Sequence, residues 1–143
     1  MKTSAKRVYE TPASSDGTRV LVDRLWPRGL SKQVAAIDSW LRDLAPSNEL
    51  RKWFHAHPEQ WAAFRKRYWK ELASPEATRS LEELYRLATK RKVTLLFASK
   101  DEEHNNAVAL RDLLNGVRKP PTGTGPASAR GAGSRQVKSM PKR

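Results

Sequence analysis

The chain contains no cysteine, and this absence removes a whole set of chemistries. It cannot form a disulfide, use a thiolate nucleophile or build a thiolate metal site, which fits a reducing compartment. No apolar run approaches the roughly 20 residues that cross a bilayer, and the N-terminus lacks the apolar stretch of a signal peptide. We therefore expect a cytoplasmic protein that does not engage a membrane.

Several motifs of familiar chemistry are also missing. The sequence has no glycine-rich phosphate loop, no Gly-x-Ser-x-Gly and no nicotinamide-binding fingerprint. His55 and His57 are two residues apart, but nothing supplies a recognisable third metal ligand. The sequence thus predicts neither a metal nor a cofactor. Whether the protein is an enzyme is open, with Asp23 and His55 as the candidate acid/base residues.

Positive charge is abundant but unevenly distributed. Of the formal net charge of +13, residues 116–143 contribute +7, since they carry seven Lys or Arg and no acidic side chain. The first 115 residues are only moderately basic, with a net charge of +6. Residues 119–143 are rich in Pro, Gly and Ser and offer only Val137 and Met140 as larger apolar groups to bury. We expect one domain over residues 1–115 and a disordered basic tail over 116–143, which could bind nucleic acid nonspecifically. The tail therefore leaves open an alternative function as a nucleic-acid-associated or regulatory protein.

Strand and helix patterns alternate along the predicted domain. Residues 1–5 have nothing to pack against and should fray. Strands are expected over residues 6–9, 18–23 and 93–98, and helices after Ser47, after Pro58, after Ser74 and over 105–115, where Gly116 ends the last one. Residues 35–44 have helical spacing and predict a short helix, with a strand as the alternative. The pattern indicates a small three-layer-like α/β domain with a three- or four-stranded, mainly parallel sheet and about five helices.

The stretch from Val20 to Gly29 is the first candidate for the functional end of the molecule. It begins as an apolar strand and ends in a loop with Arg24, Trp26 and Arg28. Loops at the carboxyl ends of parallel strands bind ligands, guanidinium groups match phosphate and carboxylate oxygens, and an indole can stack on a planar ligand. The alternative is structural: Trp26 fills the core, the proline and glycine shape the turn, and Asp23 pairs with an arginine. Both interpretations are open at this point.

Two further segments could complete a ligand site. Ser47 caps a predicted helix whose N-terminus would attract an anion, although an ordinary capping serine explains it equally well. Lys100 and Asn105 follow the strand at 93–98, and they would lie beside the Arg24 loop if strands 18–23 and 93–98 are parallel neighbours. Their alternative is a solvated loop in which an asparagine caps the last helix. Together these residues predict a basic pocket for a small anionic ligand such as a phosphate, a nucleotide or a carboxylate.

Aromatic and basic residues are interspersed between Trp53 and Trp69. Such interleaving occurs in surfaces that stack nucleic-acid bases. Because the aromatic residues follow helical spacing, the pattern favours a core stripe with a solvated basic back face.

Four blocks of this sequence occur in an order and at a spacing that resemble a known family. The blocks are Asp23-Arg24-Leu25-Trp26-Pro27-Arg28-Gly29; Ala45-Pro46-Ser47 with Leu50-Arg51 and Phe54; Tyr68 with Glu71-Leu72; and Leu95-Leu96 to Lys100 with Asn105. They resemble the bacterial domain-of-unknown-function 488 family, in its small YeaO-like branch. The resemblance extends from about Lys6 to Leu114 and implies a small cytosolic bacterial α/β protein without an assigned activity. It transfers no role to His55 or His57 and does not reach the residues after Gly116.

Overall fold

The structure is a computed structural model and describes residues 3–116. Four parallel strands form one sheet in the order β1-β4-β2-β3. The strands are β1 (Thr3–Arg7), β2 (Thr18–Leu21), β3 (Ser39–Trp40) and β4 (Val93–Phe97). The helices are α1 (Lys32–Ala35), α2 (Asn48–Ala56), α3 (Trp61–Glu71), α4 (Pro75–Lys90) and α5 (Asn106–Leu114), with short 3-10 turns η1 (Ser14–Asp16) and η2 (Arg42–Leu44). The predicted α/β class with a parallel sheet is confirmed. Apart from Gly116, the predicted tail lies outside the described residues.

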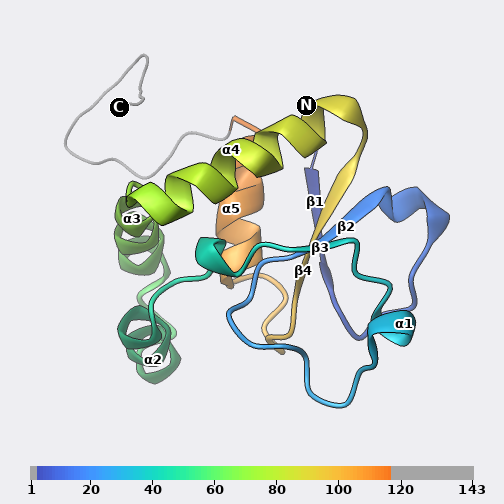
Figure 1. Ribbon diagram of the computed structural model, residues 1–143. Coiled ribbons are helices and arrows are strands. Elements are labelled where there is room, and N and C mark those ends of the chain that lie inside the picture. The colour runs from blue at the N-terminus through green and yellow to red at the C-terminus, as the bar shows by residue number, and fades with distance from the viewer. Residues whose placement is uncertain (1–2, 117–143) are drawn as a thin grey trace.

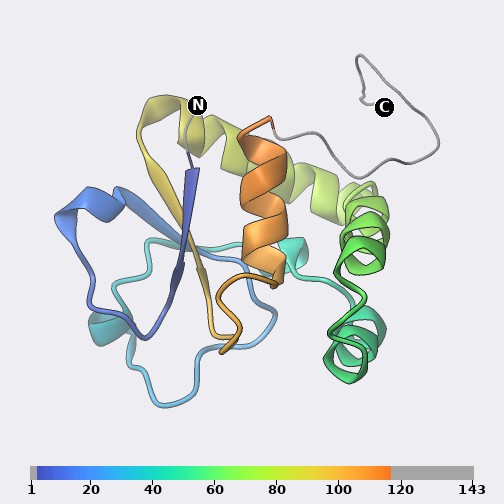
Figure 2. The same ribbon diagram turned by 180° about the vertical axis from the view of Figure 1, so that it is seen from behind.

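The sheet is the middle of three layers. Helices α2 to α5 lie on one side, whereas α1 and the loop that precedes it lie on the other (Figures 1 and 2). The helical side holds the larger core, in which Val20 and Leu95 of the sheet pack with Tyr68 and Leu84 of the helices. Leu21 and Leu96 point to the opposite face and are buried there. The strands are apolar on both faces because both faces are covered.

Two predictions about the edges of the sheet are wrong. Residues 3–5 do not fray, because β1 begins at Thr3 and pairs with β4 along its whole length. The side chain of Asn115 also accepts a hydrogen bond from the Thr3 N–H at 2.8 Å and donates one to its carbonyl at 2.9 Å. The predicted helix at 35–44 is absent: α1 ends at Ala35, Ala36 turns the chain with φ of 51°, and β3 then pairs with β2. The strand alternative is correct there for two residues only.

The predicted helix starts rest on side-chain caps that the structure confirms. Ser47 accepts a hydrogen bond from the Leu50 N–H, Ser74 from the Ala77 N–H, and Asn105 from the Val108 N–H. Each cap satisfies a backbone donor that the first helical turn leaves free. At the other end of α5, Gly116 has φ of 79°, the left-handed conformation that glycine adopts without strain.

A buried ion cluster anchors the outer layer. Asp16 is 2.6 Å from Arg19 and 3.1 Å from Lys6, and the exposed fractions of the Arg19 and Asp16 side chains are only 4% and 8%. Arg19 also donates to the carbonyls of Ala35 and Ala36. The cluster therefore fixes the end of α1 against the sheet. Although burial opposes the effect, hydrogen bonds from the Ala13 N–H, Lys6 and Arg19 hold the pKa of Asp16 below its ordinary value.

Candidate functional site

Parallel pairing brings the loops after β2 and β4 together at the carboxyl edge of the sheet, as predicted. Their link is Asp23, whose carboxylate accepts hydrogen bonds from the Ala98 N–H at 2.9 Å and from the Asn106 amide at 3.2 Å. The same amide nitrogen donates to the Val22 carbonyl at 2.9 Å. Burial raises the pKa of Asp23, and the two hydrogen bonds and the nearby charge of Arg51 oppose that rise. Asp23 therefore ties two loops together and forms no pair with Arg24 or Arg28.

Trp26 is held within the fold. Its indole N–H donates to the Leu30 carbonyl at 2.7 Å, and its ring meets the ring of Trp40 edge-on with centroids 5.5 Å apart. The indole N–H of Trp40 in turn donates to the carbonyl of Asp23 at 2.7 Å. Both indoles thus cover the second face of the sheet with their polar atoms satisfied. This placement matches the structural alternative for Trp26.

The two arginines of the loop have different surroundings. Arg28 is exposed, and its carbonyl accepts a hydrogen bond from the Tyr9 hydroxyl at 2.9 Å, beyond the end of β1. Arg24 instead reaches toward the segment after β3, where its Nη2 donates to the Ala45 carbonyl at 3.3 Å. Since β1 and β3 are the two edge strands of the sheet, the backbone of Arg28 lies beside the segment after one edge strand, and the side chain of Arg24 reaches the segment after the other.

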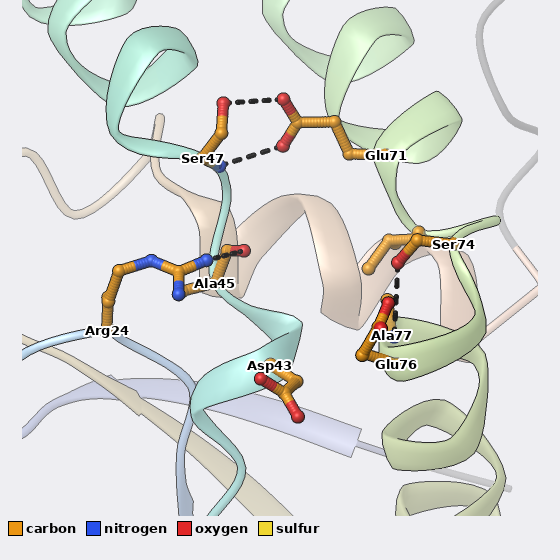
Figure 3. Close-up of a pocket in the computed structure, with 9 residues that line it drawn as sticks. Arg24, Asp43, Ala45, Ser47, Glu71, Ser74, Glu76 and Ala77 are labelled. Atoms are coloured by element: carbon orange, nitrogen blue, oxygen red, sulfur yellow. Dashed lines mark hydrogen bonds between the residues drawn. The ribbon is translucent and has the colours of Figure 1, made fainter.

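Arg24 lines a pocket of about 390 Å³ between the β2 loop, the start of α2 and the junction of α3 with α4 (Figure 3). Within residues 3–116, the Nε of Arg24 is buried without a hydrogen-bond partner. Ser47 also faces the pocket, so two of the predicted site residues share one cavity. The remaining lining residues are Asp43, Ala45, Glu71, Leu72, Ser74, Glu76 and Ala77. One guanidinium and three carboxyl groups therefore line the pocket.

The N-terminus of α2 already holds a carboxylate. Glu71, at the end of α3, accepts a hydrogen bond from the Ser47 N–H at 2.8 Å and another from the Ser47 hydroxyl at 2.6 Å (Figure 3). An acidic side chain at the C-terminal end of its own helix is unfavourably placed, and here the N-terminal dipole of a neighbouring helix compensates it. Burial, together with the charges of Asp23 and Glu71, raises the pKa of the Tyr68 hydroxyl nearby. That hydroxyl donates to the Leu44 carbonyl.

The predicted residues after β4 lie outside this pocket. Lys100 is exposed in the loop between β4 and α5. Asn105 is buried, its Oδ1 caps α5, and its Nδ2 donates to the Asp101 carbonyl at 2.8 Å. The predicted ligand-binding roles of Arg28, Lys100 and Asn105 stay predictions, and the structure gives only their positions.

The histidines are dispersed. His55 is exposed in the last turn of α2, and His57 stacks on Trp53 with ring centroids 5.5 Å apart. His104 lies 3.4 Å from Asp101 and contacts Trp61 edge-on. Over residues 3–116, no group of three or more His, Asp or Glu side chains is arranged to hold a metal ion.

Sequence reasoning missed two residues that organise this region. Glu71 could have been found from its position, because a glutamate in the last turn of a helix usually needs a partner elsewhere. Asn106 carried a weaker signal: it follows the capping Asn105, and a second asparagine is not needed to start a helix. Neither pattern identifies the partner, which lies 24 residues away for Glu71 and 83 for Asn106.

The fold and this edge define a small parallel α/β protein whose pocket lies beside the carboxyl end of β2. The chain belongs to the family described as the inactive DUF488-N3 subclade, whose model matches residues 2–129. The match therefore extends beyond Gly116, where we expected the resemblance to end. It is 43% identical over 117 residues to the Uncharacterized protein YeaO of Escherichia coli K12, covering 82% of this chain and all of that protein. It is also 43% identical over 110 residues to the Uncharacterized protein Rv3073c of Mycobacterium tuberculosis H37Rv, covering 77% of this chain and 91% of that protein.

No solved structure matches the chain at a significant level. In the part of the chain that the structure describes, no helix is both long enough and apolar enough to cross a membrane.

Proposed function

We propose that this protein is a cytoplasmic binding protein for a small anionic ligand, which Arg24 holds in the pocket beside α2. The observation that carries the proposal is the state of the Arg24 guanidinium. Within residues 3–116 its Nε is buried without a partner, and its only hydrogen bond, to the Ala45 carbonyl, is long at 3.3 Å. A guanidinium whose Nε has no partner in the described part of the fold, and which lines a cavity, is suited to a phosphate or carboxylate from outside.

The rest of the lining supports a ligand with two kinds of polar group. Asp43 and Glu76 present carboxylates around the same pocket, and carboxylates accept hydrogen bonds. A bare inorganic anion would be repelled by them. A phosphate or carboxylate that also carries hydroxyl or amino groups, such as a nucleotide, a sugar phosphate or an amino acid, would meet both the guanidinium and the carboxylates.

In this proposal the other predicted residues act at a distance. The charges of Arg28 and Lys100, both exposed at the carboxyl edge, attract an approaching anion. Trp26 and Asn105 hold the loops in shape through their internal hydrogen bonds. Asp23 ties these loops together, so neither it nor His55 has to transfer a proton. The description of the matching subclade as inactive supports binding without catalysis.

A thermal-shift titration tests the proposal with nucleoside monophosphates, sugar phosphates and amino acids as probes. A probe at 100 times its dissociation constant should raise the free energy of unfolding by about 2.7 kcal/mol. Arg24→Met should remove the shift, while Arg28→Met, the matched change in the same loop, should keep most of it. The proposal fails if no probe stabilises the protein, or if Arg24→Met responds like the unsubstituted chain.

A further inference from the structure

Helices α2 and α3 carry an exposed basic surface that the pocket does not use. Between Arg51 and Lys70 the chain has six Lys or Arg and one acidic residue, Glu59. Five of the six are exposed, and within residues 3–116 none of the five forms a salt bridge. We call these five the α2–α3 basic surface: Arg51, Lys52, Lys66, Arg67 and Lys70.

Planar groups lie within this surface. The guanidinium carbon of Arg67 on α3 is 4.1 Å from the centre of the Trp53 ring on α2, so this contact bridges the two helices. The ring of His57 also stacks on Trp53. Phe64 and Tyr68 are fully in the core, which confirms the predicted apolar stripe for them, whereas Trp53 remains half-buried. The aromatic and basic residues between Trp53 and Trp69 therefore contribute to both the core and the exposed surface.

We propose that the α2–α3 basic surface binds single-stranded nucleic acid. Unpaired lysines and arginines match a chain of phosphates. The Arg67–Trp53 pair adds a planar platform, and an exposed guanidinium plane over an indole is a surface on which an unpaired base can stack. A duplex offers its phosphates but keeps its bases paired, so the platform favours the single strand.

The same residues do not fit a membrane surface. Helices that lie in a bilayer interface expose large apolar side chains beside their basic ones. In the described part of the chain the exposed large apolar residues are Tyr9, Leu25, Val34 and Tyr85, and none of them belongs to α2 or α3. The surface is basic and contains planar side-chain groups, and it has no exposed large apolar side chain to insert into a bilayer.

The test uses the full chain, a labelled single-stranded oligonucleotide of about 15 nucleotides and the corresponding duplex. Binding is measured by fluorescence anisotropy at several salt concentrations for the unsubstituted chain and two triple variants. One variant removes three charges of the surface: Lys66→Ala, Arg67→Ala and Lys70→Ala. The matched control removes three exposed charges on α1 and α4: Lys32→Ala, Arg79→Ala and Lys90→Ala.

For the single strand, losing three phosphate contacts should make the negative slope of log K against log salt shallower by about 2. The control should stay close to the unsubstituted chain, because its charges lie elsewhere and are screened. If both variants lose the same slope, only net charge matters and the proposal is overturned. It is also overturned if the surface variant binds unchanged, which would place binding among residues 117–143, or if the duplex binds as tightly as the single strand.

A single conservative variant isolates the stacking contribution. Arg67→Lys keeps the charge and removes the planar guanidinium over Trp53. We expect the salt slope to persist while affinity for the single strand falls about tenfold. Unchanged affinity would contradict the stacking platform. Arg24→Met should leave single-strand binding intact, so failure of this proposal is distinguishable from failure of the pocket.

Discussion

Replacing Arg24 by methionine should leave the protein as stable as before, or make it more stable. Methionine preserves most of the aliphatic stem and removes the guanidinium. The change forfeits one long hydrogen bond to the Ala45 carbonyl, which contributes about 0.5–1.5 kcal/mol. It also removes a buried donor without a partner, whose burial costs about 1–3 kcal/mol. The free energy of unfolding should therefore lie between about 0.5 kcal/mol below its original value and about 2.5 kcal/mol above it.

Urea unfolding followed by tryptophan fluorescence measures this difference. A thermal scan provides a check, since 1 kcal/mol moves the midpoint of a domain of this size by about 4 °C. Arg19→Met is the matched control, because Arg19 is buried with Asp16 and donates to two carbonyls. Leaving Asp16 without this partner should cost about 3–5 kcal/mol. A loss above about 2 kcal/mol in Arg24→Met would mean that the fold depends on this guanidinium, and the ligand argument would be refuted.

Three further changes test contacts that hold the fold together. Tyr68→Phe should lower the free energy of unfolding by about 1–3 kcal/mol in urea titrations, because a buried carbonyl loses its donor; a loss below about 0.5 kcal/mol would contradict that hydrogen bond. Gly17→Ala should destabilise the protein far more than Gly29→Ala, since a Cβ at Gly17 would clash with the Lys92 carbonyl while Gly29 has open space and both have positive φ; equal midpoints in thermal scans would contradict the clash. Asp16 has a depressed pKa, so its stabilisation is present above the ordinary value of 3.8 and is lost as pH falls through the folded-state value; Asp16→Asn should flatten that acid limb of a stability–pH curve, and an unchanged limb would assign it to other groups.

Local sequence patterns were sufficient to predict most of the helices and the central strands. The capping serines at 47 and 74 and the buried strand at Val93–Phe97 are each specified within a few residues. Such signals are local because a cap bonds three residues ahead and a buried strand is apolar throughout.

The edges of the sheet could not be predicted in the same way. The polar β1 is a strand because β4, some 90 residues later, pairs with it and Asn115 clamps its start. The two-residue β3 is too short to show a period. Each depends on contacts that only the folded chain supplies.

The meeting of the loops at the carboxyl edge was predictable, but the set of residues that line the pocket was not. The carboxyl edge and the parallel pairing followed from the strand pattern. The sequence gives no sign that the pocket takes in Arg24 but not Arg28, or that it holds Asp43, Glu71 and Glu76, because these come from different elements. The sequence shows a basic loop, whereas the pocket in the structure is lined by both basic and acidic side chains.

Selection for folding alone is enough to retain Trp26 within the stretch from Asp23 to Leu30. Removing the Trp26 ring would open the layer above Leu21 and Leu96, and tryptophan-to-alanine changes cost about 3–5 kcal/mol, a large part of the 5–15 kcal/mol that holds a typical domain together. A relative that no longer binds the ligand would therefore keep this tryptophan, whereas Arg24 would be lost by drift. Sequence change in this stretch therefore distinguishes two kinds of selection: retention of Trp26 reflects the fold, and retention of Arg24 reflects the ligand.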